Sequence, residues 1–589
     1  MVLSSSPGVA FPLVVENSSL STLADLLSHE NPDVAVSVVQ VLEEFSDPEG
    51  LEPDPNDDED DDEVRGGTAT GESAEERDEQ KRRAVRALLE AVREAGVVEI
   101  VVSGLKRFDE ADEDQRTGVF HTLSLLENLL TLSPSTFLPI LLSPTSPFLS
   151  YLVDRLTLAS PSPAYDQNKY YAAEMLSFVL SLSELDIAAG DDDEEKGQRA
   201  NGSTTANKSN GVLEARMRVG SEGWVEALLK VLSVYRKRDP SSSDETEFME
   251  NCFDVLCTTL SSRVPSLDPL TTTDPSSSSS PTGRRSNWIT TPHPVKQAFL
   301  EAEGVELMLL LLSKASKPKS KKHPHHAGGG GGEQVEIGLR SLKCLSHALS
   351  GCRVEPQARQ LGERFVEGMG LKSLFSIFMG KSSKKRSSTL TPETVEHIVS
   401  ILASLLTSLP SDSPPRLRVL TKFIEDGYSK LDRLLEVRNE VDERIERAIE
   451  RYRKVRDELD DEVEAVQGES EQERNERRAE EEYFERLENG GMSLQFVDYV
   501  AAWICMEDDG AREHYEMILS RESKSLRNLI DTLAEYRDNI AIDPTDLEPR
   551  GAKTEGEEQE EQESAMTEGE LQRAILDQLV QYLEGVAKR

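Results

Sequence analysis

The segments Val38-Val-Gln-Val-Leu-Glu-Glu-Phe45, Leu123-Ser-Leu-Leu-Glu-Asn-Leu-Leu130 and Leu342-Lys-Cys-Leu-Ser-His-Ala-Leu349 decide the fold, because each repeats one pattern. Their apolar residues recur three and four positions apart, which predicts a helix with one buried face. A second apolar helix precedes most segments of this kind. Six segments share the pattern: 33–47, 116–133, 169–183, 247–262, 336–351 and 392–409.

A single helix pair cannot bury its own apolar face, so successive pairs must stack. The long spacing, broken by inserts, indicates armadillo or HEAT units of about 40–47 residues. We therefore predict an all-α, right-handed solenoid of stacked helices with a C-terminal helical and coiled-coil extension. Stacked units usually bind an extended partner along their concave surface, which makes binding, rather than catalysis, the first functional hypothesis.

Shifts in composition divide the 589-residue chain into six parts. The repeats should carry disordered inserts near 189–210, 264–290 and 314–332, which are rich in Gly and Asp, in Ser, Thr and Pro, and in Lys and Gly, respectively. Apolar residues spaced as in a heptad repeat run from Val441 to Leu459. The predicted parts are an N-terminal helical cap (1–46), an acidic segment (47–74), the repeats (75–415), a C-terminal helical region (416–540) with a long charged helix (431–466), an acidic linker (541–568) and a terminal helix (569–589).

The charge balance limits the partners. The formal net charge is −44, from 110 acidic and 66 basic residues. A chain this acidic repels nucleic-acid phosphates and attracts basic peptides, so we expect no direct nucleic-acid binding. No apolar run reaches the roughly 18–20 residues of a membrane span, and the N-terminus does not have the pattern of a signal peptide. The five cysteines lie in or beside apolar helical segments, which is typical of reduced, buried thiols.

Motifs for chemistry are incomplete. Cys252 and Cys257 miss the Cys-x-x-Cys spacing of zinc and redox sites, and His323-Pro-His325-His326 has no nearby cysteine to complete a metal site. Gly368-Met-Gly370 has Ser373 in place of the third glycine of a dinucleotide fingerprint, and is better explained as a turn between paired helices. We therefore predict a protein without catalytic residues, metal or cofactor.

Two basic clusters resemble nuclear-localisation signals. They comprise Lys317, Lys319, Lys321 and Lys322 in one cluster and Lys384, Lys385 and Arg386 in the other. The alternative is a solvated loop, or an electrostatic tether to the chain's own acidic stretches.

The concave surface gives the most specific hypothesis. The last helix of each armadillo unit lines the groove, where Asn and acidic residues can bond a peptide backbone and pair with Lys or Arg. A solvated helix face is the alternative for each position, because sequence does not fix which face points inward. The candidates are Glu127, Asn128, Glu174, Glu250, Asn251, Asp254 and Glu396.

Several ordered motifs resemble the β-catenin-like protein 1 family. They are Ser28-His-Glu-Asn-Pro-Asp-Val-Ala35, Asn168-Lys-Tyr-Tyr-Ala-Ala-Glu-Met175, Arg340-Ser-Leu-Lys-Cys-Leu-Ser346, Phe365-Val-Glu-Gly-Met-Gly-Leu-Lys372, Phe484-Glu-Arg-Leu-Glu-Asn-Gly490 and Ala534-Glu-Tyr-Arg-Asp-Asn539. The resemblance implies an armadillo-type solenoid in the nucleus, associated with the spliceosome through the NineTeen complex and its Myb-related splicing subunit. It also implies binding of basic, nuclear-localisation-type peptides on splicing factors. The three inserts depart from the family pattern.

Two other functions stay open at this point. An importin-α-like nuclear-import adaptor would begin with a basic segment, whereas this N-terminus is apolar and then acidic. An assembly protein could act through the long helix at 431–466, by self-association or by docking a partner.

Overall fold

The computed structural model describes residues 7–16, 19–48, 74–158, 166–182, 203–262, 292–315, 333–351, 355–380, 390–462, 471–540 and 568–588. Within these residues every regular element is a helix, which confirms the all-α prediction. The helices form two compact units, Met1–Pro265 and Ser266–Arg589. No helix in this part of the chain is both long and apolar enough to cross a membrane.

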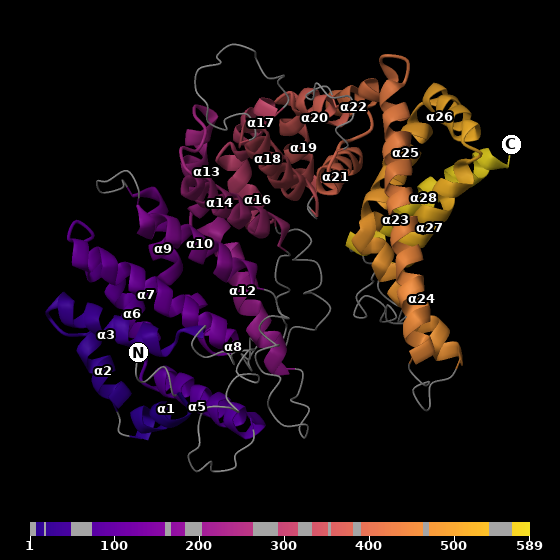
Figure 1. The fold of residues 1–589 in the computed structure, drawn as a ribbon. Coiled ribbons are helices and arrows are strands. Elements are labelled where there is room, and N and C mark those ends of the chain that lie inside the picture. Colours follow the sequence, from indigo (N-terminus) through magenta and orange to yellow (C-terminus); the bar gives the residue numbers. More distant parts are fainter. Residues whose placement is uncertain are drawn as a thin grey trace, which may run out of the picture. The chain divides into compact units, whose positions relative to one another are not determined.

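In the first unit the helices come in sets of three, coloured indigo to magenta in Figure 1. All four third helices that the sequence predicts here, α3, α7, α10 and α14, are present. The sets are α1 (Pro7–Glu16), α2 (Ser19–Leu27) and α3 (Pro32–Phe45); α5 (Ala74–Glu94), α6 (Val97–Gly104) with the 3-10 turn η1 (Leu105–Arg107), and α7 (Glu113–Leu132); α8 (Pro134–Leu142), α9 (Phe148–Thr157) and α10 (Gln167–Ser181); and α12 (Ser203–Ser221), α13 (Trp224–Leu232) with η2 (Ser233–Arg236), and α14 (Ser243–Ser261).

The second unit continues the three-helix pattern and then changes. Its repeats contain the two remaining predicted third helices, α18 and α21. The sets are α16 (Pro294–Glu301), α17 (Gly304–Ala315) and α18 (Glu333–Leu349), followed by α19 (Glu355–Glu367), α20 (Gly370–Phe378) and α21 (Pro392–Ser408). The C-terminal region comprises α22 (Pro414–Ile424), α23 (Ser429–Glu462), α24 (Glu471–Arg486), the π-helical turn η4 (Leu487–Gly491), α25 (Met492–Glu507), α26 (Asp509–Arg521), α27 (Leu526–Asp538) and α28 (Glu568–Ala587).

The third helices stack on one another and form the spine of each unit. In the first unit α7 packs against α3 and α10, and α10 packs against α14. In the second unit α21 packs against α18 and α25. The leucines of α7 show the depth of this burial, since Leu123, Leu126 and Leu129 are at most 1% exposed. Full burial of one such side chain stabilises the fold by about 1.5–3 kcal/mol, so the stacked spine carries much of the stability.

Short polar side chains fix where the third helices begin. Asn31, Asp112, Asp166, Ser242 and Thr391 precede α3, α7, α10, α14 and α21, and each side chain accepts a hydrogen bond from a backbone N–H of the first turn. Such caps satisfy N–H groups that have no partner inside the helix.

A left-handed residue separates the first and second helices of four sets. It is Gly96 before α6, Gly223 before α13, Glu303 before α17 and Met369 before α20, with φ between 55° and 77°. A single residue with this backbone conformation ends one helix and lets the next begin at once. This confirms that Gly368-Met-Gly370 is a turn between paired helices. It also shows that the repeat is a three-helix armadillo unit rather than the two-helix unit of HEAT proteins.

One sequence expectation was wrong in detail. The segment 189–210 was expected to be an insert throughout, but α12 begins at Ser203, because Val212, Ala215 and Val219 bury its next turns. Within the C-terminal region, α24 pairs with α23 through charged side chains. In the same region, Ser525 and Asn528 form a capping box that starts α27.

The long charged helix is present as α23, but half of its apolar seam is used inside the chain. Val441, Ile445 and Ala448 are at most 4% exposed, and α23 packs against α24, η4, α25 and α26. Val455, farther along the seam, is 57% exposed. The described part of the seam therefore leaves little apolar surface for a second chain.

Met369→Gly should stabilise the second unit by about 1 kcal/mol, because a residue with a Cβ is strained in the left-handed conformation and glycine is not. Little apolar burial is lost, since Met369 is 62% exposed. Urea denaturation followed by circular dichroism measures the change. Gly223→Ala in the equivalent turn, where the added methyl meets open space, should destabilise by a similar amount. Changes in stability of the same sign for the two substitutions would show that strain in the left-handed conformation does not decide the outcome.

Candidate peptide-binding surface

The spine of the first unit brings several candidate residues onto neighbouring helices. Glu127 and Asn128 lie on α7, Glu174 lies on α10, and Glu250, Asn251 and Asp254 lie on α14. Since α10 contacts both α7 and α14, residues of three consecutive units share one surface. Glu396 lies on α21 in the second unit.

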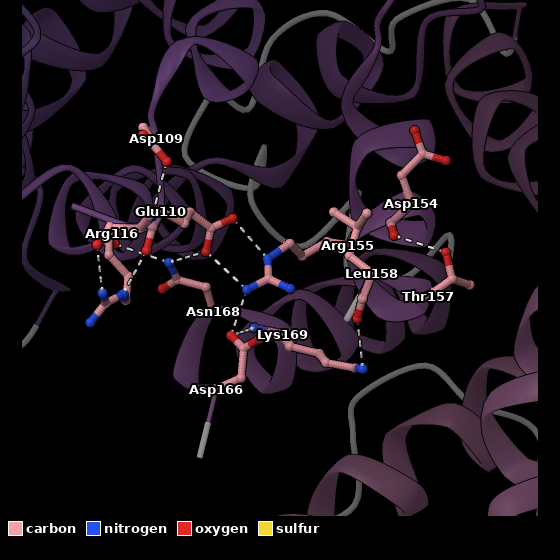
Figure 2. Close-up of polar contacts among 11 residues, drawn as sticks. Asp109, Glu110, Arg116, Asp154, Arg155, Thr157, Leu158, Asp166, Asn168 and Lys169 are labelled. Carbon is pink, nitrogen blue, oxygen red and sulfur yellow. Dashed lines mark hydrogen bonds and ion pairs between the residues drawn. The ribbon is translucent and has the colours of Figure 1, made fainter. Parts of the chain in front are cut away.

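The position of α10 depends on a buried ionic network at its first turn (Figure 2). The guanidinium of Arg155 on α9 lies 2.9 Å from Glu110, in the loop before α7, and makes a short ion pair with Asp166. Arg155 is only 2% exposed. Asp166 in turn accepts a hydrogen bond from the backbone N–H of Lys169 at 3.1 Å. One cation therefore ties the loop before α7, helix α9 and the start of α10 together.

Asn168 completes this network. Its side-chain amide donates to the Glu110 carboxylate and to the backbone carbonyl of Arg116 on α7, both at 2.9 Å. Asn168 is 2% exposed, so both bonds form in a site shielded from water. The network fixes the position of α10 relative to α7. It thereby fixes the positions of the side chains of Tyr171 and Glu174.

Glu127 and Glu174 are brought together on this surface. The phenol of Tyr171 on α10 donates a short hydrogen bond to the half-buried carboxylate of Glu127 on α7. Glu174 is one turn farther along α10 and is exposed. Partial burial raises the pKa of Glu174, and the carboxylates of Glu127 and Glu247 raise this pKa further. We call Glu127, Glu174 and Glu247 the acidic ladder, because they occupy three successive third helices.

The acidic ladder continues along one face of α14. Glu247, Glu250, Asn251 and Asp254 are spaced three, four and seven residues apart, so they lie on the same side of the helix. Glu247 is exposed, and the other three are half-buried. Glu250 and Asp254 have further interactions within the chain. A partner would therefore meet a run of carboxylates with one amide among them.

Asn128 also takes part in the contact between α3 and α7. Its amide donates to the backbone carbonyl of Glu43 on α3, with an N–O distance of 3.4 Å. The Glu43 carboxylate lies 2.5 Å from Nδ1 of His121 on α7. An asparagine amide has two N–H donors and one acceptor oxygen, so this bond uses only one of the groups with which Asn128 could bond a peptide backbone.

Glu396 has both acidic and basic residues near it, unlike Glu174. It is exposed on α21, and partial burial together with Glu393 raises its pKa, while Arg444 and Lys343 oppose that rise. Lys343 on α18 also lies 3.5 Å from Glu393. The spine of the second unit therefore carries mixed charge where the first unit carries acidic charge.

Sequence reasoning missed Glu247 and Tyr171. Glu247 lies three residues before Glu250 on the same predicted helix face, and this spacing could have identified it. Tyr171 stands within the family-like motif 168–175, but its hydrogen bond to Glu127 spans 44 residues. No sequence spacing reveals a contact of that range.

Other sequence predictions can be placed as follows. Cys252, Cys257, Cys344 and Cys505 are buried and are not disulfide-bonded, and burial raises the pKa of the Cys252 and Cys505 thiols to about 12. Among the described residues, no group of three or more metal-ligating side chains is found. The residues that follow were also predicted and lie outside the described part of the chain: Cys352, the His323–His326 motif, and both basic clusters, Lys317, Lys319, Lys321, Lys322, Lys384, Lys385 and Arg386.

Three-helix units with a left-handed turn, stacked through their third helices, define an armadillo-repeat protein. Comparison with known proteins gives the family. The chain belongs to the family described as catenin-beta-like, Arm-motif-containing nuclear proteins, whose sequence profile matches residues 1–265 and 288–534. This agrees with the resemblance in the sequence motifs.

Individual relatives support the assignment along most of the chain. The β-catenin-like protein 1 homolog of Schizosaccharomyces pombe is 26% identical over 539 residues, which cover 92% of this chain and 71% of that protein. The human β-catenin-like protein 1 is 27% identical over 532 residues, which cover 90% of this chain and 72% of that protein. The rat protein matches over the same shares with the same identity.

The structure shows what residues of two family-like motifs do in the fold. In 484–490, Gly490 has a φ of 113°, and a Cβ there would lie 2.1 Å from the guanidinium of Arg444. The carbonyl of the preceding Asn489 accepts a hydrogen bond from Arg444 Nε at 2.8 Å. In 168–175, Asn168 belongs to the buried network and Glu174 to the acidic ladder. The motif 484–490 thus joins α23 to η4, and the motif 168–175 contributes to the candidate surface.

Arg155→Met should destabilise the first unit by about 3–5 kcal/mol, because it leaves the carboxylates of Glu110 and Asp166 without their buried cation. Denaturant unfolding monitored by circular dichroism measures the loss. Arg93→Met, which breaks an exposed ion pair with Glu90, should cost less than about 1 kcal/mol. Adding Glu110→Gln and Asp166→Asn to Arg155→Met should restore part of the stability. Similar losses for the two arginine variants would show that the network is not a main support of α10.

Proposed function

We propose that this chain is a non-enzymatic nuclear scaffold that binds Lys/Arg-rich, nuclear-localisation-type peptides of pre-mRNA splicing factors. Within this proposal it belongs to the spliceosome-associated NineTeen complex, and the Myb-related subunit of that complex is one of its partners. The armadillo class supports a binding role, because stacked third helices present a long surface to an extended segment. The family description supports a nuclear location.

The observation that carries the proposal is the convergence of Glu127, Glu174 and Glu247 on three stacked third helices. Burial raises the pKa of Glu174, and the other two carboxylates raise it further. The charges that act on this carboxylate are those of Glu127 and Glu247, both acidic. An arriving Lys or Arg would relieve that repulsion, so the surface favours a cation. Exposed ion pairs contribute about 0.2–1 kcal/mol each, whereas micromolar affinity requires about 8 kcal/mol. Binding therefore needs several pairs together with backbone contacts, as an extended peptide provides.

The direct test is fluorescence anisotropy with a labelled Lys/Arg-rich splicing-factor peptide and a scrambled peptide of equal charge, at physiological salt. Glu174→Lys with Glu247→Lys should weaken binding at least about tenfold, because two attractions become repulsions, and tenfold corresponds to about 1.4 kcal/mol. The matched control is Glu214→Lys with Glu226→Lys, which makes the same charge change at exposed positions on α12 and α13. Equal losses in both double variants, or equal binding of the scrambled peptide, would mean that only the net charge acts.

Peptide affinity should also depend on pH. A bound cation lowers the pKa of Glu174 towards its usual range, so binding releases a proton and strengthens as pH rises through the raised pKa of the free protein. Titrations from pH 7 to pH 5 at constant salt, with a peptide that lacks histidine, should show weaker binding at pH 5. Glu174→Gln should bind more weakly at pH 7 and respond less to pH. An unchanged pH response in that variant would exclude Glu174 from the contact.

A further inference from the structure

Helix α28 occupies an apolar site formed by α25 and α27 (Figure 1, yellow). Leu576, Leu579 and Leu583 are fully buried, and Val580 is 6% exposed. These residues are spaced as i, i+3, i+4 and i+7, which is one face of a helix. The contact therefore has the form of an amphipathic helix bound in a groove between two others.

Polar contacts at the rim of the groove fix the register of α28. The Tyr582 hydroxyl donates to the backbone carbonyl of Cys505 on α25 at 2.9 Å. Arg537 on α27 lies 3.0 Å from the Asp577 carboxylate, which is on the exposed side of α28. A helix that replaced α28 would fit best with four apolar residues at this spacing, an acidic residue opposite Arg537 and a hydrogen-bond donor opposite the Cys505 carbonyl.

The family profile matches most of the residues that form the groove but not the helix that fills it. Helix α25 and most of α27 lie within the matched residues, which end at 534, whereas α28 begins at 568. Residues 541–567, which are rich in glutamate, connect α27 to α28. The walls of the site are thus a family feature, while its occupant lies beyond the family match and is joined to the site by 27 residues of chain.

We propose that the groove between α25 and α27 is a docking site for an amphipathic helix of a partner protein, and that α28 is its tethered internal competitor. The partner helix carries Leu, Val or Ile at the positions of Leu576, Leu579, Val580 and Leu583, and an acidic residue at that of Asp577. Because α28 belongs to the same chain as the groove, its binding there is intramolecular, which raises its effective concentration above that of a free helix. An external helix with the same contacts therefore binds only when it is tighter or when α28 is displaced. This inference does not depend on peptide binding at the acidic ladder.

The test uses the full chain and a fluorescent peptide of residues 568–588 as the probe helix. Leu576→Asp with Leu579→Asp removes α28 from the groove and leaves the groove residues unchanged. This variant should bind the probe saturably and at least about a hundredfold more tightly than the wild-type chain. The matched control is Gln578→Asp with Gln581→Asp, which adds the same charge at exposed positions of α28 and should behave as the wild type.

A second measurement covers the case in which the first variant unfolds. A protease site placed within residues 541–567 of the wild-type chain is cleaved, and excess probe is added. Exchange of the probe for the released α28 would support the proposal. Retention of α28 against excess probe would overturn it, because the helix would then be a fixed part of the core. Concentration-dependent dimerisation of the wild type that disappears in Leu576→Asp/Leu579→Asp would also overturn it, since the occupant would then be α28 of a second copy.

Discussion

A third helix in this protein has to bury side chains against two neighbouring third helices and still keep one polar side. Helix α10 shows the consequence, because Ala172, Ala173, Met175 and Leu176 are all buried while Glu174 between them is exposed. Small residues at 172 and 173 let the adjacent helices approach, and the larger residues fill the space between units. On α10 the candidate surface thus lies where packing leaves Glu174 uncovered, and its position is set by the same contacts that hold the units together.

The same constraint explains where the ionic groups are found. A buried arginine is tolerated only when its charge and hydrogen bonds are matched, and Arg155 meets this condition by joining Glu110 to Asp166. In the second unit Arg438 on α23 pairs with the fully buried Asp498 on α25, with distances of 2.7 and 3.0 Å. Both pairs connect segments that are distant in sequence, so they select one arrangement of helices among the many that apolar contacts alone would allow.

The sequence predicted the third helices because their apolar spacing is dictated by burial, and burial is the dominant signal in a helical array. It gave no bounds for α24, whose contacts with α23 include charge pairs such as Arg453 with Glu482 that leave no apolar pattern. On the candidate surface, Glu174 was chosen because it is an acidic residue on a predicted third helix, and the structure shows that it is exposed. Asn128 looked equivalent, but its amide reaches the backbone of Glu43, 85 residues away. Local spacing identifies the side of a helix, whereas the partner of each side chain depends on how units stack.

The left-handed turns between first and second helices also govern where the chain can change its length. Gly96, Gly223, Glu303 and Met369 each lie in a junction of only two residues. The longer connections all lie elsewhere in the repeats, either between second and third helices, as at 316–332 and 381–389, or between units, as at 183–202 and 263–291. Insertions and deletions can therefore accumulate at these connections while the tight junctions keep the units in register. Relatives of this chain can differ in loop content, and in whatever regulation those loops bring, without any change in the spacing of the spine.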